Sequence, residues 1–205
     1  MEATYIETQQ ISFQDFKNQI LEDYKLGRIS REMSYLGRRE VLTGKAKFGI
    51  FGDGKELPQL AMAKVFKKGD FRSGYYRDQT FAMAINAVSV ESFFAQLYAD
   101  TSVEREPASA GRQMNGHYAT RSLNEDGSWK NLMQQKNISS DISPTAGQMP
   151  RLLGLAMASK VYKSVKFEGS EKFSNEGNEV AFGTIGDAST AEGHFWETLN
   201  AACAL

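Results

Sequence analysis

Apolar residues recur at helical spacing near the start of the chain, and this pattern predicts a helix. The apolar positions of its stripe are Phe13, Phe16, Ile20, Leu21 and Tyr24. Ser12 precedes the stripe and Asp15 follows three residues later, as in a capping box. Gly27 is expected to end this helix, and a second helix is expected over residues 29–41.

The rest of the chain divides into short apolar segments separated by polar, glycine-rich stretches. Helical periodicity predicts further helices over residues 56–68, 79–87, 90–100, 149–162 and 191–205. Short β-favouring runs predict strands over residues 71–76, 137–142 and 180–185. Loops are expected over residues 44–54, 101–136 and 163–179.

Several residues of these helices have an expected structural role. The buried side of the helix over 56–68 is expected to carry either Leu60, Ala63 and Phe66 or Met62 and Phe66. Ser89 is expected to cap the helix that follows it. The small residues Gly154, Ala156 and Ala158 are expected to let their helix pack closely against a sheet.

Strand and helix alternate in the later part of the chain, which favours an α/β fold. Residues 180–185, Val-Ala-Phe-Gly-Thr-Ile, have the continuous apolar character of a buried parallel strand. We therefore predict an N-terminal helical arm over residues 1–45, followed by one α/β domain over residues 46–205.

Composition narrows the classes of function. The chain has 205 residues, 41% of them hydrophobic and 24% charged, which is typical of a globular protein. Its net charge of −1 gives no reason to expect nucleic acid or an anionic membrane as a partner. With one cysteine, Cys203, an internal disulfide is excluded. Residues 1–10 lack a signal or transit pattern, so we expect a cytoplasmic location.

The segment after the last predicted strand has the chemistry of a phosphate and metal site. Residues 186–193 are Gly-Asp-Ala-Ser-Thr-Ala-Glu-Gly, between a parallel strand and a helix. The N–H groups at a helix start can face phosphate oxygens. Asp187 beside phosphate requires a cation between them, and with only two histidines in the chain magnesium suits best. The alternative is that Asp187 merely caps the helix.

Residues 186–200 resemble the first half of the thiamine diphosphate motif in alpha subunits of 2-oxoacid dehydrogenases. That motif has an acidic residue after glycine, a small-residue loop, Glu-Gly, and a helix with Asn-x-Ala, which residues 200–202 match. Ala188 stands where the family usually has glycine. The resemblance implies that Asp187 binds magnesium. It assigns to the cofactor site the positions Gly186, Asp187, Ala188 and Ser189.

A second segment resembles the family's Tyr-Arg-Asp sequence. Residues 75–79 are Tyr-Tyr-Arg-Asp-Gln, and the resemblance implies that Tyr76 and Arg77 contact the diphosphate. Arginine presents a planar, permanently charged fork that suits phosphate oxygens. The alternative for Arg77 is an ion pair with Asp78.

Two more segments match in the same order. Residues 143–150 resemble the family's Ser-Pro-Leu-Ala-Thr-Gln-x-Pro, which implies that Ser143 and Thr145 approach the cofactor. Thr145 replaces the usual leucine, and Gly147 replaces a threonine that binds potassium in some members, which argues against potassium here. Residues 111–118 resemble the Gly-Arg-Gln-Met-x-x-His-Tyr stretch of the branched-chain branch.

Residues 49–54 contain a Gly-Asp-Gly, which alone could be mistaken for the thiamine signature. No strong strand precedes it, and residues 79–86 lack the required asparagine pair. We interpret this segment as a loop at the rim of the active site or a subunit contact. His117 is a candidate for the substrate channel, although a structural histidine is an equally good interpretation.

The resemblance spans about residues 31–205. It implies a fold, a reaction and partner chains. The fold is the thiamine diphosphate-binding fold, a parallel sheet with helices on both faces. The reaction is oxidative decarboxylation of a 2-oxoacid, with transfer of the acyl group to the lipoyl-bearing acyltransferase component. A beta subunit or beta domain supplies the activating glutamate. The catalytic histidine and the second half of the magnesium site are expected after Leu205, so we name no catalytic residue.

Other interpretations remain open at this stage. A transketolase-like enzyme is disfavoured by the segments at residues 75–79 and 143–150. A non-catalytic phosphate-binding module and an inactive fragment are the remaining alternatives, although no P-loop and no dinucleotide glycine motif is present. The sequence favours branched 2-oxoacids only weakly. It leaves open the oligomeric state and whether alpha and beta parts share one chain.

Overall fold

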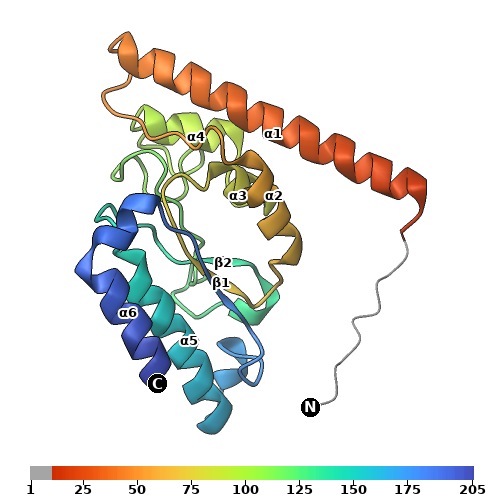
Figure 1. The fold of residues 1–205 in the computed structure, drawn as a ribbon, viewed down its shortest axis with the longest axis vertical. Helices are drawn as coiled ribbons and strands as arrows, with labels where there is room; N and C mark the ends of the chain where they lie inside the picture. Colours follow the sequence, from red (N-terminus) through yellow and green to blue (C-terminus); the bar gives the residue numbers. More distant parts are fainter. Residues whose placement is uncertain (1–10) are drawn as a thin grey trace.

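The computed structural model describes residues 11–205, and the expectation about residues 1–10 lies outside them. The α-helices are α1 (Phe13–Leu42), α2 (Glu56–Val65), α3 (Gln79–Ala84), α4 (Val90–Leu97), α5 (Gln148–Ser164) and α6 (Gly193–Ala204) (Figure 1). Short 3-10 helices cover Leu132–Gln134, Ser170–Lys172 and Asp187–Ala191. The strands are β1 (Phe71–Ser73), β2 (Asn137–Ile138) and β3 (Ala181–Gly183).

The three strands form one parallel sheet in the order β2-β1-β3, which confirms the predicted α/β character. Phe71 pairs with Asn137 on one side and with Ala181 on the other. All three strands are shorter than predicted, because pairing stops where the chain turns away at their carboxyl ends. Among residues 11–205, no helix is both long and apolar enough to cross a membrane.

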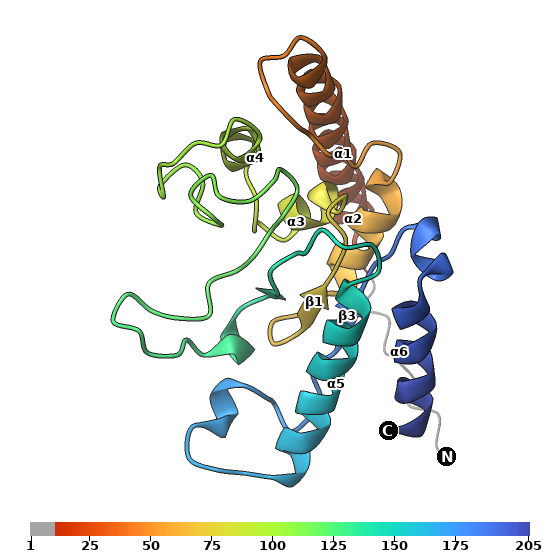
Figure 2. The same ribbon diagram turned by 90° about the vertical axis from the view of Figure 1, so that its left-hand side faces the viewer.

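Helices cover both faces of this sheet (Figures 1 and 2). On one face, Phe66 at the end of α2 packs edge-on against Phe81 of α3 and Phe182 of β3, with ring centroids 5.2 Å apart in each pair. On the other face, α5 lies close enough that a Cβ on Gly183 would meet Leu152 at 2.4 Å. α6 then packs beside α5.

The predicted break at Gly27 is wrong, because α1 is one continuous helix of 30 residues. Interior glycine costs a helix about 1 kcal/mol. At this position, however, packing against α2 supports the helix, since a Cβ on Gly27 would lie 3.6 Å from Leu60. The expected start is confirmed, with the Ser12 hydroxyl accepting a hydrogen bond from the Asp15 N–H at 3.1 Å.

The first half of α1 presents its apolar stripe to solvent in the described part of the chain. Its buried residues, Ser30 to Glu40, all lie in the second half. The first-half side chains are exposed, from 49% for Phe16 to 80% for Phe13. The pattern therefore predicted the helix correctly, although this stripe does not face the core.

The other predicted helices are present, with ends that move by three residues or fewer. Leu60, Ala63 and Phe66 are buried as expected. Ser89 caps α4 in a reciprocal pair with Ser92. The prediction for the small residues of α5 is wrong, because a Cβ on Gly154 would meet no atom within 4 Å.

Arg31 ties α1 to α2 through a two-pronged ion pair. Its Nε and Nη2 donate to the two Glu56 carboxylate oxygens, each at 2.6 Å. The Gly54 N–H donates to the same carboxylate. Arg31 lowers the pKa of the mostly buried Glu56 carboxyl, since these hydrogen bonds favour the charged form.

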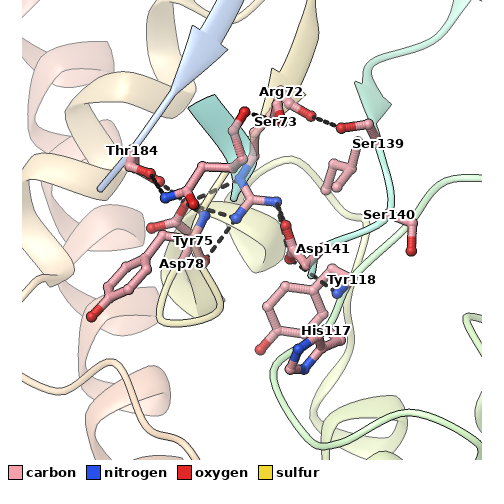
Figure 3. Close-up of polar contacts among 12 residues, drawn as sticks. Arg72, Ser73, Tyr75, Asp78, His117, Tyr118, Ser139, Ser140, Asp141 and Thr184 are labelled. Carbon is pink, nitrogen blue, oxygen red and sulfur yellow. Dashed lines mark hydrogen bonds and ion pairs between the residues drawn. The ribbon is translucent and has the colours of Figure 1, made fainter. Parts of the chain in front are cut away.

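Arg72 of β1 is fully buried and links three segments (Figure 3). Its Nη1 donates to Asp141 at 3.0 Å, while Nε and Nη2 donate to Asp78 Oδ2 at 3.0 and 2.7 Å. Nη2 also donates to the Tyr75 carbonyl at 2.8 Å. Burial opposes the charge of Arg72, but Asp141 and Asp78 outweigh it and raise the pKa of the guanidinium.

Replacing Arg72 by methionine should destabilise the chain by about 3–5 kcal/mol, because two buried carboxylates would lose their counter-ion. Urea unfolding followed by circular dichroism measures this loss. Arg28→Met is the matched control, since Arg28 pairs with Glu32 on the exposed surface of α1. A loss from Arg72→Met no larger than the control's would contradict the role assigned to Arg72.

The Arg31–Glu56 pair should make stability depend on pH. Because the folded-state pKa of Glu56 is lowered, its contribution is present above the ordinary glutamate pKa and disappears as pH falls through the folded-state value. Glu56→Gln should therefore destabilise the chain at pH 7 and approach wild-type stability towards pH 3. Unfolding curves at several pH values test this, with the exposed Glu32→Gln as control. A gap between variant and wild type that stays constant with pH would refute it.

Candidate functional site

The carboxyl ends of the three parallel strands lie at one edge of the sheet, as parallel pairing requires. In open α/β sheets this edge is where ligands bind. The segment after β1 contains Tyr75 to Asp78, the segment after β2 leads to Ser143, and the segment after β3 leads to Gly186 and Asp187. The structure thus brings the sequence-predicted residues to one region.

The turn after β1 holds Tyr76 and Arg77. The Asp78 N–H donates to the Tyr75 carbonyl at 3.0 Å, and the Tyr75 N–H donates to Asp78 Oδ2 at 3.2 Å. The alternative of an Arg77–Asp78 ion pair is wrong, because Asp78 pairs with Arg72. Arg77 is exposed, and its guanidinium carbon lies 6.0 Å from the centroid of the Tyr75 ring.

Gly186 lies directly against Tyr75. A Cβ on Gly186 would stand 2.9 Å from the Tyr75 hydroxyl and 3.2 Å from Cζ. The backbone of Gly186 has φ −83°, which any residue adopts, so the glycine is needed for space and not for conformation. The turns after β1 and β3 therefore touch at this point.

Asp187 opens a 3-10 helix, and its carboxylate is exposed. The alternative that it caps α6 is wrong, because the residue at the start of α6 is Glu192, which itself makes no side-chain cap. Ala188 is exposed beside Asp187, whereas Ser189 is buried at 1% exposure. The Ser189 side chain is therefore packed inside the turn and does not face an open site.

Ser143 is linked to the Tyr76 turn through His117. The Nε2 of His117 lies 3.0 Å from the Ser143 hydroxyl, and its Nδ1 lies 3.0 Å from the Met114 carbonyl. Because a carbonyl only accepts, Nδ1 carries a proton, and Nε2 is the ring nitrogen that pairs with the Ser143 hydroxyl. The His117 ring also stacks on Tyr76 at 6.1 Å.

Thr145 joins the same region through its backbone. Its carbonyl accepts a hydrogen bond from His194 Nε2 at 2.8 Å, which connects this loop to the start of α6. Ala146 adopts the left-handed conformation with φ +60°. A Cβ at Gly147 would meet Ile142 at 2.6 Å, so a threonine would not fit here without movement.

A hydrogen bond couples the turn after β1 to the end of β3. The Thr184 hydroxyl donates to Asp78 Oδ2, the carboxylate oxygen that Arg72 also holds (Figure 3). The Thr184 carbonyl accepts from Gln148 Nε2 at 2.8 Å. Thr184 precedes Gly186 by two residues, so this contact fixes the start of the Gly186 turn.

The loop over residues 49–54 lies against the Arg77 turn, in agreement with its interpretation as part of a site's rim. A Cβ on Gly52 would stand 2.2 Å from the Arg77 carbonyl, and the Gly52 N–H donates to Gln79 at 3.0 Å. Phe48, Phe51, Tyr76 and Arg77 are among the residues lining a cavity of about 530 Å³ here. The Gly-Asp-Gly over residues 52–54 therefore packs against the Arg77 turn at this edge of the sheet.

Sequence reasoning missed Tyr75 and the network around Arg72. Tyr75 was visible as the first tyrosine of a Tyr-Tyr pair, yet its contact with Gly186 depends on folding. Arg72 had a sequence signal, since a charged residue in a short apolar strand is rarely buried without partners. Among residues 11–205, no three His, Cys, Asp or Glu side chains gather to hold a metal ion.

The comparisons with known proteins identify the family of the chain. The family described as the dehydrogenase E1 component matches residues 24–205. The chain belongs to this family. It is also 28% identical over 180 residues to the 2-oxoisovalerate dehydrogenase subunit alpha of Bacillus subtilis (strain 168). That match covers 85% of this chain and 43% of the relative, so the chain spans less than half of its length.

The resemblance to the branched-chain 2-oxoacid dehydrogenase alpha subunit, first drawn from four motifs, is confirmed by these two matches. All four motifs fall within the matched residues 24–205. Membership in the E1 component family identifies the general class of the chain.

Replacing Thr184 by valine should destabilise the chain by about 1 kcal/mol, because one hydrogen bond to Asp78 is lost while the shape is kept. Thr184→Ser keeps the hydroxyl and should recover most of the loss. Urea unfolding of both variants measures the difference. A loss in the serine variant as large as that in the valine variant would contradict the role assigned to the hydroxyl, because serine retains it.

Proposed function

We propose that this chain is the cofactor-phosphate-binding part of a thiamine diphosphate-dependent 2-oxoacid dehydrogenase. The observation that carries this proposal is the meeting of Arg77 and Asp187 around Tyr75 at the carboxyl edge of the sheet. Arg77 lies over the Tyr75 ring, and Tyr75 touches Gly186, the residue before Asp187. Neither charged side chain is paired within the described residues. A diphosphate with magnesium would satisfy both charges.

Each residue has a defined part in this proposal. Arg77 and Tyr76 bind the diphosphate oxygens, and Asp187 holds magnesium against them. Gly186 leaves room for the turn to approach, and the Ala188 and Ser189 backbone follows it. When bound, the cofactor supplies the carbanion and electron sink that decarboxylation of a 2-oxoacid requires.

Ser143 and Thr145 lie on the loop that completes the site. His117 fixes the Ser143 hydroxyl, and His194 fixes the Thr145 carbonyl. We therefore assign to this loop the approach to the cofactor and its substrate. Further magnesium ligands would be backbone oxygens or groups outside residues 11–205. The site has no feature that requires potassium.

The partners follow from the same class of enzyme. A beta subunit or beta domain would complete the active site, and a lipoyl-bearing acyltransferase component would receive the acyl group. The curated relative's name specifies 2-oxoisovalerate, which supports a branched 2-oxoacid as the substrate here. We place the protein in the cytoplasm, with residues 1–45 as an arm and residues 46–205 as the cofactor domain.

A second candidate function is phosphate binding without catalysis. The exposed Arg77 and the adjacent Gly186 turn would hold a phosphate ligand in either case. A non-catalytic module would bind its ligand without magnesium and without a beta partner. The two proposals are therefore separated by the metal dependence of binding.

Calorimetric titration of thiamine diphosphate into the chain assembled with its beta partner tests the proposal. Binding should require magnesium, and Asp187→Ala should weaken it at least tenfold because the metal bridge is lost. Asp126→Ala, in the distant loop, is the control and should bind as wild type. Saturable binding that ignores both magnesium and Asp187 would leave the non-catalytic module as the function.

A further inference from the structure

Tyr75 stands between the two charged residues of the proposed site. Its hydroxyl lies against the Gly186 turn, and its ring contacts the Arg77 guanidinium. On the other side, its ring centroid lies 4.5 Å from that of Tyr76. No motif assigned Tyr75 a role, because the resemblance begins at the second tyrosine of the pair.

The backbone of Tyr75 is held firmly. Arg72 donates to its carbonyl at 2.8 Å, and its N–H donates to Asp78 at 3.2 Å. Both partners are buried at 2% exposure or less. The Tyr75 backbone is thus held by the same hydrogen-bond network that fixes the end of β3 through Thr184. Its position relative to Gly186 is therefore set by the fold.

We propose that the Tyr75 hydroxyl is a further ligand-binding group, which donates a hydrogen bond to a phosphoryl oxygen of the bound diphosphate. This inference rests on the proposed function and deepens it. A phosphoryl oxygen placed between Arg77 and a cation on Asp187 comes within reach of a donor that touches Gly186. A phenol O–H is a suitable donor to an anionic oxygen.

The protonation state of Tyr75 agrees with this role. Burial raises the pKa of the phenol, Arg77 opposes this shift, and the neighbouring Tyr76 phenol adds to it. The hydroxyl therefore keeps its proton at neutral pH and can donate. The contact also explains why position 186 lacks a side chain, since a methyl group there would displace the hydroxyl.

The test is calorimetric titration of the assembled alpha and beta chains with magnesium and either thiamine diphosphate or inorganic diphosphate. Tyr75→Phe removes only the hydroxyl and should weaken both ligands about tenfold, the loss expected for one hydrogen bond to a charged group. The melting temperature of the ligand-free protein should stay within about 1 °C, because the change removes a single hydroxyl from a half-buried side chain. Tyr162→Phe, near the end of α5 where the ring stacks on Phe173, is the matched control and should change neither affinity.

A second pair of variants checks the contact with Gly186. Gly186→Ala should weaken binding in the wild-type background, because its methyl group would crowd the Tyr75 hydroxyl and Cζ. In the Tyr75→Ala background the same change should cost much less, since the crowded atoms are gone. Additive losses would show that Tyr75 and Gly186 act independently and would overturn the inference.

The outcomes separate the inference from the proposed function. Wild-type binding that needs magnesium and Asp187, with unchanged affinity in Tyr75→Phe, overturns the role of Tyr75 alone. Loss of thiamine diphosphate affinity without loss of inorganic diphosphate affinity also overturns it, because the hydroxyl would then contact another part of the cofactor. Absence of binding in the wild type removes both proposals.

Discussion

The candidate site depends on the ion pairs and hydrogen bonds that the Arg72 guanidinium makes. The guanidinium donates to the carboxylates of Asp78 and Asp141 and to the Tyr75 carbonyl, and none of these side chains is more than 4% exposed except that of Tyr75. A buried ion pair is weak evidence for stability, because desolvation offsets the attraction. Its effect here is positional, since Asp78 also accepts from Thr184. One cation thereby fixes the ends of all three strands relative to each other.

The ion pair between Arg72 and Asp78 determines which nearby charged side chains remain unpaired. Arg72 forms an ion pair with the carboxylate of Asp78, which is the acidic neighbour of Arg77 in the sequence. Arg77 is therefore left exposed beside Tyr75, at the edge where parallel sheets bind ligands. The sequential pair Arg77-Asp78 favoured a local ion pair, but the fold directs the two side chains to different partners. Arg77 makes no ion pair with its sequence neighbour because the buried Arg72 holds the Asp78 carboxylate.

Much of the fold followed from residue patterns, and the exceptions have physical causes. Periodicity located the helices, because an amphipathic stripe is a local property. It placed a break at Gly27 that packing against Leu60 removes, and it gave no reason to expect the exposed stripe around Phe16. The strands were predicted too long, since the length of a strand depends on partners that lie 66 and 110 residues away from Phe71.

The site shows the same division between local and distant information. The motifs named Tyr76, Arg77, Ser143 and the Gly186 turn, and parallel pairing brings all of them to one edge. The motifs could not show that Ser189 is buried, because burial depends on how the turn packs. They also could not show the Tyr75 contact, which joins segments more than 100 residues apart. A motif carries the chemistry of a site, whereas contacts between segments decide which of its atoms a ligand can reach.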